Sequence, residues 1–249
     1  MNDWITPVWP APANVRALCT TRYGGVSAGA YASLNLGDHV DDDPLAVAHN
    51  RALLREHLPA DPLWLKQVHT TTVAAADCAC GTPEADAAIA RQPHKICAVL
   101  TADCLPVLLC DHAGIVVGAA HAGWRGLAAG VIESTIAAMD ADPATLLAWL
   151  GPAIGPSAFE VGDEVREIFL AYDGAAASAF TPHAPGKWLA DIYRLARLRL
   201  AHSGITQIYG GDFCTFHDRE RFFSYRRDGT TGRMASLIWL NPPFAPIIS

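Results

Sequence analysis

The stretch from Ile96 to Ala122 is the most apolar part of the chain, and it constrains the possible folds more than any other feature. Polar residues interrupt it at Thr101, Asp103, Asp111, His112 and His121. It therefore does not have the composition of a membrane span, and we expect buried strands instead. The strand-like runs cover Ile96–Thr101, Pro106–Cys110 and Ile115–Ala120. Very short turns separate them, whereas a parallel crossover needs about a dozen residues, so antiparallel pairing is expected.

Helical patterns are expected on both sides of this apolar centre. Asp43 can cap a helix that has Pro44 at its first position and ends before Pro59. Apolar residues at helical spacing predict further helices over Leu127–Met139, Glu164–Tyr172 and Trp188–His202. Strand patterns also cover Leu63–His69, Gln207–Gly210 and Ser236–Leu240. Within the last helix, the sequence predicts a solvated face formed by Arg194, Arg197 and Arg199.

This order of elements predicts an α/β protein built as a layered α-β-β-α sandwich with largely antiparallel or mixed sheets. No internal repeat, low-complexity tract or long linker divides the chain. We therefore expect residues 1–249 to form a single domain, with its body over residues 15–243 and short tails at both ends.

Charge and cysteine content indicate the class of partner and the compartment. A net charge of −7 and a pI near 5.7 do not favour a nucleic-acid surface, which needs clustered basic residues, so small molecules are the expected partners. The N-terminus has no basic segment followed by an apolar one, as a signal peptide would. The seven cysteines, an odd number, are expected to be reduced thiols, and Cys78 and Cys80 have no second pair at zinc-site spacing. These features predict a cytoplasmic protein without membrane contact, and they do not indicate its oligomeric state.

Three segments place reactive side chains where predicted strands end: Lys66–His69, Thr101–Cys104 and His121–Gly126. Two imidazoles and a thiolate, with a fourth position left open, are typical of a catalytic zinc site, and zinc supplies Lewis acidity and lowers the pKa of bound water. The alternative is a metal-free Cys104 nucleophile activated by His69 or His121. Sequence spacing alone leaves both interpretations open.

An ordered series of short motifs resembles the YfiH family. The motifs are Thr20-Thr21-Arg22, Gly24-Gly25-Val26-Ser27, Ser33-Leu34-Asn35-Leu36-Gly37, Asn50-Arg51, Lys66-Gln67-Val68-His69, Ala102-Asp103-Cys104-Leu105-Pro106, His121-Ala122-Gly123-Trp124-Arg125-Gly126, Gly151-Pro152-Ala153-Ile154-Gly155, Glu160-Val161-Gly162, Cys214-Thr215 and Ser224-Tyr225-Arg226-Arg227. The family is also described as laccase-domain or polyphenol oxidase proteins, purine nucleoside phosphorylases and peptidoglycan editing factors. The resemblance extends over nearly the whole chain.

The resemblance implies that His69, Cys104 and His121 are three zinc ligands. It also implies a fold related to cysteine-hydrolase toxins and phosphorolysis of adenosine, inosine and methylthioadenosine, with some adenosine deamination. Seven residues have the right chemistry to line a pocket for a purine nucleoside and phosphate: Arg22, Asn35, Gln67, Asp86, Arg125, Ser224 and Arg226. Each of them is equally suited to tying loops together. Arg125 is the phosphate candidate, and Asp103 is a candidate proton carrier.

Three other functions remain as alternatives. The family names also imply editing of peptidoglycan precursors by amide hydrolysis, which needs water and no phosphate. A multicopper phenol oxidase needs many histidines, commonly in H-x-H pairs, and this chain has no such pair. Copper could still occupy the site formed by two histidines and a cysteine, because it ranks above zinc in intrinsic affinity. A non-catalytic zinc-stabilised binding module would normally offer four protein ligands, and no fourth is apparent.

Overall fold

The computed structural model describes residues 3–242, and its strands form three sheets. The four-stranded sheet has the order β1 (Val15–Cys19), β13 (Met234–Leu240), β5 (Ile96–Thr101) and β2 (Pro62–Leu63). The six-stranded sheet has the order β12 (Gln207–Gly210), β8 (Leu146–Leu150), β6 (Leu105–Asp111), β7 (Val117–Ala122), β4 (Ala87–Ala90) and β3 (Val73–Ala75). The three-stranded sheet has the order β10 (Phe180–Ala184), β11 (Lys187–Ala190) and β9 (Glu160–Gly162).

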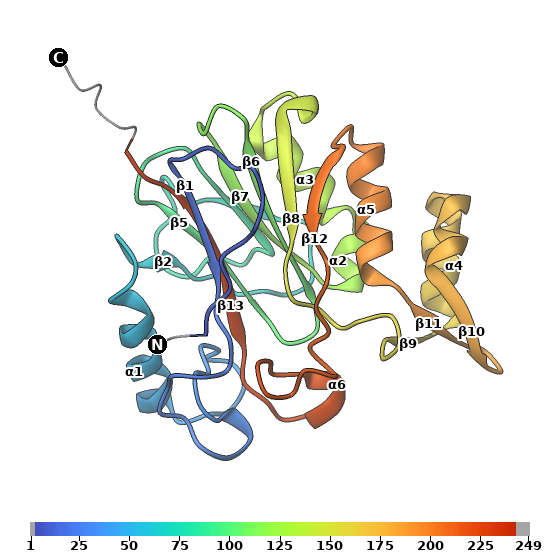
Figure 1. Cartoon of the computed structure of the whole chain (residues 1–249), viewed down its shortest axis with the longest axis horizontal. Helices are drawn as coiled ribbons and strands as arrows, with labels where there is room; N and C mark the ends of the chain where they lie inside the picture. The colour runs from blue at the N-terminus through green and yellow to red at the C-terminus, as the bar shows by residue number, and fades with distance from the viewer. Residues whose placement is uncertain (1–2, 243–249) are drawn as a thin grey trace.

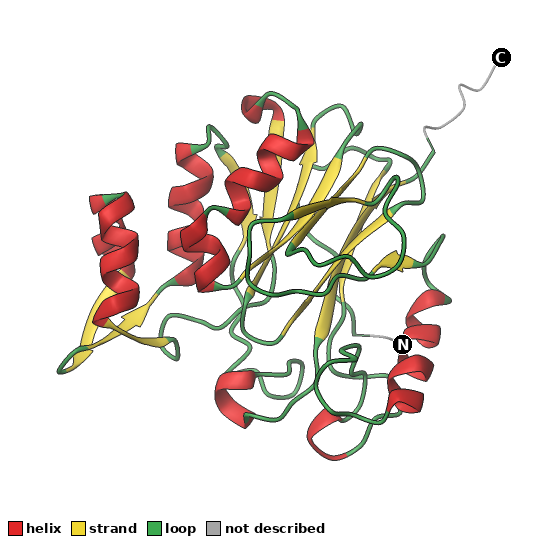
Figure 2. Cartoon of the chain, turned by 180° about the vertical axis from the view of Figure 1, so that it is seen from behind, coloured by secondary structure: helices red, strands yellow, loops and turns green. Residues whose placement is uncertain are grey.

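Helices lie on both outer sides of the two larger sheets (Figures 1 and 2). They are α1 (Pro44–Arg55), α2 (Trp124–Ala129), α3 (Val131–Met139), α4 (Asp163–Tyr172), α5 (Ile192–His202) and the short α6 (Tyr225–Asp228). Short 3₁₀ helices occur at η1 (Gly29–Tyr31), η2 (Pro143–Thr145) and η3 (Gly174–Ala179). Helix α4 and the three-stranded sheet project beside α5 in Figure 1.

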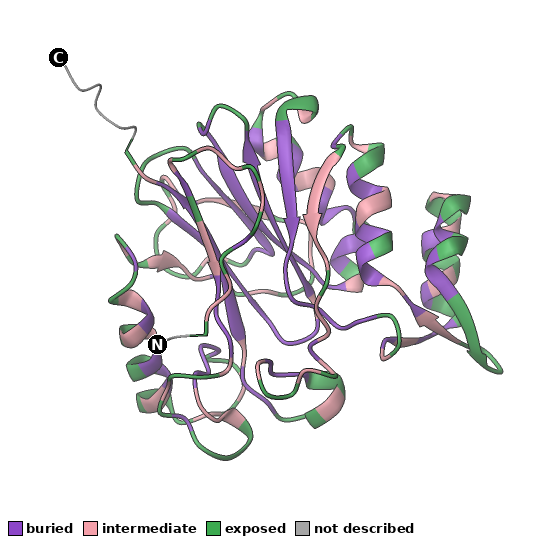
Figure 3. Ribbon diagram, in the orientation of Figure 1, coloured by how far each residue is buried: buried purple, intermediate pink, exposed green. Residues whose placement is uncertain are grey.

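Separate hydrophobic clusters hold four layers together. Leu54 of α1 packs on one face of the four-stranded sheet. Val99 of that sheet and Leu108 of the six-stranded sheet belong to the cluster between the two sheets. Ile132 of α3 and Leu200 of α5 pack on the outer face of the six-stranded sheet. The central strands are accordingly buried on both faces, whereas the β10–β11 hairpin is largely exposed (Figure 3). The α/β class and the α-β-β-α sandwich are confirmed.

The predicted antiparallel pairing is confirmed for β6 and β7 but is wrong for β5 and β6, because the chain turns at Asp103 from the four-stranded sheet into the six-stranded sheet. β6 pairs antiparallel with β7 and β8, and β5 pairs antiparallel with β13. Parallel pairs occur at β2–β5, β3–β4 and β8–β12, so the sheets are mixed. The predicted start at Ile115 was two residues too early, because Asp111 Oδ1 accepts the backbone N–H groups of Ile115 and Val116 in the turn that precedes β7.

The helix boundaries are confirmed at α1 and corrected at two other helices. Asp43 caps α1 by accepting the N–H of Leu45. The continuous helix predicted over Leu127–Met139 is wrong, because Gly130 has φ of 101° and separates α2 from α3. The predicted helix start at Trp188 is also wrong, because that residue lies in β11; Asp191 caps α5 by accepting the N–H of Arg194.

The predicted strand Leu63–His69 is limited to its first residue, which lies in β2. The backbone N–H groups of Val68, His69 and Thr70 donate to the carboxylate of Asp86 and not to a neighbouring strand. A buried carboxylate thus replaces the strand partner, and the segment becomes a loop that presents His69.

The predicted tails are partly described. Ile5 pairs with Cys19 through two backbone hydrogen bonds, so the chain before residue 15 is not a free tail throughout. Residues 1–2 and 243–249, including the predicted boundary at 243, lie outside the described residues.

All seven cysteines are free thiols, and none forms a disulfide. Within residues 3–242, no helix combines the length and apolar character that crossing a bilayer requires.

The predicted solvated arginine face of α5 is wrong at Arg199, which is only 5% exposed. Arg199 forms an ion pair with Glu133 of α3 and lies over the ring of Tyr172 at 3.7 Å. We expect Arg199→Ala to lower the free energy of unfolding by about 3 kcal/mol, because it leaves the Glu133 carboxylate largely buried without its partner. Chemical denaturation measures this loss.

Arg194 provides the matched control for this prediction, because it lies on the same helix but is exposed. Arg194→Ala should change the free energy of unfolding by less than about 1 kcal/mol. Equal effects of the two substitutions would show that the α3–α5 ion pair contributes nothing beyond a surface contact.

Candidate metal centre and substrate cavity

Three side chains that are far apart in the sequence meet at one end of β5, β6 and β7. His69 lies in the loop held by Asp86, Cys104 lies directly before β6, and His121 lies near the end of β7. His69 Nε2 is 3.9 Å from Cys104 Sγ, and the two imidazole rings are 4.8 Å apart between centroids. The potential ligand atoms all lie within 4.8 Å of one another. The structure therefore brings together the three residues that the sequence singles out as metal ligands.

Local backbone features allow this close approach. His69 has a positive φ of 62°, a conformation that is uncommon for a residue other than glycine and that the bonds to Asp86 hold in place. A Cβ atom at Gly123 would lie 2.9 Å from Cys104 Sγ and 2.9 Å from His69 Cδ2. Any larger residue at 123 would therefore push into the space shared by the thiol and the imidazole.

The carboxylate of Asp86 is the anchor of the centre and is fully buried. It accepts His121 Nδ1–H at 2.8 Å, which leaves His121 Nε2 free to face Cys104. It also accepts three backbone N–H groups and the hydroxyl of Thr70. Burial raises the pKa of Asp86, but the hydrogen bonds from His121, Thr70 and Val68 outweigh it and hold the pKa well below its usual range. A carboxylate that orients a ligand histidine is a recurrent arrangement around bound metals.

The electrostatics of the triad favour a thiolate at neutral pH. Burial raises the pKa of Cys104, but the charge of His121 and hydrogen bonds from His121 and His69 lower it to about 6. Burial lowers the pKa of His121, but Cys104 and Asp86 raise it to about 9. The metal-free triad thus stores a proton on His121, and a metal that takes both residues as ligands must release that proton.

The donor set fits one transition-metal ion. Zinc bonds to imidazole nitrogen at about 2.0–2.1 Å and to thiolate sulfur at about 2.3 Å, so ligand atoms now up to 4.8 Å apart must move about 1 Å closer together to share an ion. Within residues 3–242, this is the single cluster of three or more histidine, cysteine or acidic side chains close enough to hold a metal. Three protein ligands leave a coordination position for water or substrate.

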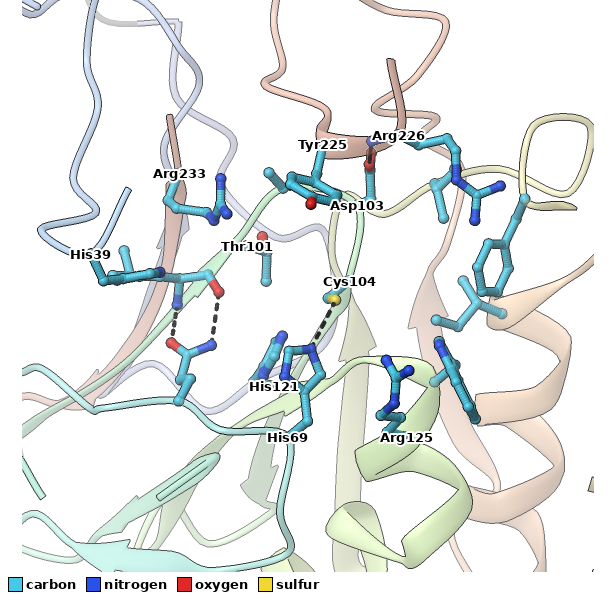
Figure 4. A pocket seen from close by; sticks show the side chains of 17 residues that line it. His39, His69, Thr101, Asp103, Cys104, His121, Arg125, Tyr225, Arg226 and Arg233 are labelled. Carbon is cyan, nitrogen blue, oxygen red and sulfur yellow. Dashed lines mark hydrogen bonds between the residues drawn. The ribbon is translucent and has the colours of Figure 1, made fainter. Parts of the chain in front are cut away.

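A cavity of about 530 Å³ opens over the triad. Figure 4 shows Arg233 and His39 on one side, Arg125 and Arg226 on the other, and Tyr225 above Cys104. The remaining lining residues are Gln67, Leu100, Thr101, Ala102, Asp103, Trp124, Ile154, Phe159 and Ile192. Sequence motifs pointed to neither His39 nor Arg233 as a wall residue, because neither belongs to a run of reactive residues at a predicted strand end.

Of the seven predicted substrate residues, three line this cavity: Gln67, Arg125 and Arg226. The Gln67 amide exchanges two hydrogen bonds with the backbone of Leu100, so it also ties its loop to β5. Arg226 donates to the carbonyl of Glu160, and Arg125 is exposed and lies 4.4 Å from the ring centroid of Trp124.

The other four predicted substrate residues do not line the cavity, and hydrogen bonds to neighbouring segments occupy them. Arg22 donates to the carbonyls of Ala32 and Arg219. Ser224 caps α6, and buried Asn35 links Gly37, Asp42 and Arg233. Asp86 lies behind His121, as described above.

Asp103, the candidate proton carrier, is engaged in holding loops. Its carboxylate accepts the hydroxyl of Thr215 and the N–H of Arg226, each at 2.6 Å. Its φ of 90° places it in a tight turn directly before Cys104. These bonds favour a role in positioning Cys104 and α6.

Comparison with known proteins gives matches along nearly the entire chain. The sequence model of the family described as multi-copper polyphenol oxidoreductase laccase matches residues 16–241. A purine nucleoside phosphorylase of Pseudomonas aeruginosa is 58% identical, covering 96% of this chain and 99% of that protein. The purine nucleoside phosphorylase YfiH of Escherichia coli is 55% identical, covering 96% of this chain and all of that protein.

Solved structures agree with this relationship. A Neisseria meningitidis protein of 55% identity superposes with a TM-score of 0.93 over 96% of this chain and 99% of that chain. YlmD of Geobacillus stearothermophilus, at 32% identity, superposes with a TM-score of 0.87 over 93% of this chain and 94% of that chain. On motifs, fold and full-length similarity together, this chain belongs to the YfiH family.

Proposed function

We propose that this protein is a zinc-dependent purine nucleoside phosphorylase. The observation that carries the proposal is the His69–Cys104–His121 triad at the base of a cavity of about 530 Å³ whose wall includes three arginines. Cavities of about 300–1,000 Å³ are typical for small-molecule ligands. The relatives named as purine nucleoside phosphorylases match over their whole length, which supports the same activity here.

Each residue of the centre has a defined task in this proposal. His69, Cys104 and His121 hold the zinc ion, and Asp86 keeps His121 in the tautomer whose Nε2 carries the free lone pair. When bound, zinc supplies Lewis acidity toward an oxygen or nitrogen atom of the substrate. The low pKa of Cys104 keeps that ligand in its thiolate form at neutral pH.

One side of the cavity suits a purine base. Trp124 and Phe159 contribute aromatic surface, and Ile154 and Ile192 add aliphatic surface. The guanidinium carbon of Arg125 lies 4.4 Å from the ring centroid of Trp124, and that of Arg226 lies 5.6 Å from the ring centroid of Phe159. We propose that Gln67, Arg125 and Arg226 contact the nucleoside, while Arg22, Asn35, Asp86 and Ser224 act indirectly by holding the loops that form the wall.

The proposed substrates are adenosine, inosine and methylthioadenosine, whose shared purine nucleoside framework is what such a cavity would recognise. Adenosine deamination is proposed as a secondary reaction of the same site. The H-x-E and P-C-x-x-C segments of zinc nucleobase deaminases are absent from the sequence, so any deamination here would rest on different residues. Ammonia release from adenosine distinguishes deamination from phosphorolysis.

Two other functions would use the same centre. Amide hydrolysis of peptidoglycan precursors needs only water, so a strict phosphate requirement separates phosphorolysis from it. The same three ligands would also bind copper, which ranks above zinc in intrinsic affinity for such donors. A coupled multicopper oxidase needs further ligand clusters, however, and residues 3–242 contain a single candidate cluster.

Metal removal tests the role of zinc. We expect the purified protein to contain about one zinc per chain, and dialysis against a chelator to lower phosphorolysis of inosine at least ~10²-fold. One equivalent of zinc should restore the rate. Full turnover by protein that metal analysis shows to be stripped would contradict the proposal.

A further inference from the structure

The cavity wall is cationic on both sides of the metal ligands, but the two sides differ in character. In Figure 4, Arg125 and Arg226 lie on one side, and Arg233 and His39 lie on the other. Trp124 lies beside Arg125 and Phe159 beside Arg226, whereas the neighbours on the Arg233 side are polar: His39, Thr101 and the phenol of Tyr225. A ligand with one flat apolar part and one anionic part would therefore have a distinct place for each.

Arg233 is fixed by hydrogen bonds and forms no ion pair within residues 3–242, although the charges of Cys104 and Asp103 act on it from nearby. Its guanidinium Nη1 donates to the carbonyls of Thr231 and Gly232, and its backbone N–H donates to Asn35 Oδ1. Its side chain packs against Gly37, where an added Cβ atom would lie 2.8 Å from Arg233 Cγ. None of the ion pairs found within residues 3–242 includes Arg233, although the residue is half-buried. A fixed, partly desolvated guanidinium whose other N–H groups make no hydrogen bond within residues 3–242 is suited to binding an anion.

His39 and Tyr225 complete this part of the wall. Both line the cavity, and Tyr225 lies 5.9 Å from the Arg233 guanidinium, measured to the ring centroid. The His39 side chain is about half exposed and lies 3.5 Å from Asp38. An imidazole N–H and a phenolic hydroxyl are hydrogen-bond donors that a bound oxyanion can use beside the arginine.

Arg125 is the phosphate candidate suggested by the sequence, but its surroundings are less favourable for binding phosphate than those of Arg233. It is exposed, and no hydrogen bond or ion pair fixes its guanidinium among the described residues. Its guanidinium carbon lies 4.4 Å from the ring centroid of Trp124, on the side of the cavity that suits the base. An exposed, unfixed charge binds an anion more weakly, because water screens it and binding must immobilise the side chain.

We propose that Arg233, assisted by His39, forms the subsite for inorganic phosphate, and that the purine lies on the opposite side, between Trp124 and Phe159. This inference rests on the proposed phosphorolysis. An oxygen of HPO₄²⁻ forms a bond to C1′ of the ribose, and the C1′–N9 bond breaks with its electron pair leaving on the purine. The proton of HPO₄²⁻ ends on the released base, and ribose 1-phosphate is the second product. The nucleophile approaches C1′ from the face opposite the base, which matches two subsites on opposite sides of the triad.

The test is direct binding of inorganic phosphate, with no turnover required, to zinc-loaded protein by equilibrium dialysis. Arg233→Met should weaken phosphate binding at least about 10-fold, because it removes charge-assisted hydrogen bonds, and Arg233→Lys should recover part of the loss. Arg125→Met should leave phosphate affinity within about 2-fold and instead raise the KM for inosine. Arg16 is exposed on β1 and does not line the cavity, so Arg16→Met is the matched control and should change neither the phosphate affinity nor the KM for inosine.

The outcomes separate this inference from the proposed function. Phosphorolysis by the parent protein, with phosphate affinity lost in Arg125→Met and kept in Arg233→Met, would overturn the subsite and leave the function standing. Inosine cleavage without phosphate would reject the function itself. Phosphate binding that depends on Arg233 in a protein that does not cleave nucleosides would keep the subsite and reject the reaction. If Arg233→Met does not fold, phosphate binding is measured with Arg233→Lys and His39→Ala instead. Unchanged phosphate affinity in both variants would contradict the proposed phosphate subsite.

Discussion

Alanine at His69, Cys104 or His121 is expected to remove most of the bound zinc and to lower kcat/KM for inosine at least ~10²-fold, about 2.7 kcal/mol of transition-state stabilisation. The reason is that the three ligand atoms lie within 4.8 Å of one another, and two of them do not define a catalytic site for zinc. Metal analysis and steady-state kinetics on the same preparation measure both effects. Loss of zinc and loss of rate should occur together in all three variants.

Matched controls exist for both ligand types. Cys78 and His49 are exposed and lie outside the cavity, so their replacement by alanine should change neither zinc content nor rate. Cys104→Ala also separates the two chemistries that the sequence leaves open. Unchanged zinc in this variant, together with a trapped covalent Cys104 intermediate in the parent, would assign the thiol as a nucleophile and not a ligand.

Asp86→Asn should have the second-largest effect although Asp86 does not line the cavity. Both carboxylate oxygens accept hydrogen bonds from His121, Thr70 and the backbone of the His69 loop. An asparagine offers one acceptor oxygen and turns an NH₂ group toward donors. We expect the free energy of unfolding to fall by roughly 3 kcal/mol and zinc affinity to fall about 10–100-fold. Denaturation curves and zinc competition titrations measure the two quantities.

Asp111 is a well-matched control, because it is also buried and also accepts backbone N–H groups, from Ile115 and Val116. Asp111→Asn should destabilise the fold without changing zinc affinity, since Asp111 contacts none of the metal ligands. If Asp86→Asn lowered stability alone, in the manner of Asp111→Asn, the carboxylate would be a loop anchor with no influence on the metal.

The parts of the fold that sequence analysis predicted are those in which local pattern and burial agree. The strands between Ile96 and Ala122 are apolar and buried, and the Asp43 cap is a local hydrogen bond. The β10–β11 hairpin was missed because most of its residues are exposed and show no apolar alternation. Trp188 and Leu189 happen to continue the apolar spacing of α5, which shifted the predicted helix start into β11.

The sequence predicted those site residues that a short motif identifies by itself. The motifs place His69, Cys104 and His121 near predicted strand ends. In the structure His69 lies in the loop held by Asp86, Cys104 directly precedes β6, and His121 lies within β7. Whether an amide or arginine of a motif faces the cavity depends on contacts between distant segments. Asn35, for example, is bound to Arg233, which lies 198 residues further along the chain. Arg233 itself precedes β13 as an isolated arginine, so nothing in the local sequence marks it as part of the wall.

The most direct test of the proposed function is the fate of the ribose when zinc-quantified protein cleaves inosine with and without inorganic phosphate. Phosphorolysis predicts hypoxanthine and ribose 1-phosphate in equal amounts, formed only when phosphate is present. Equal cleavage of inosine in the absence of phosphate, with free ribose as the product, would contradict the proposal and identify the enzyme as a hydrolase.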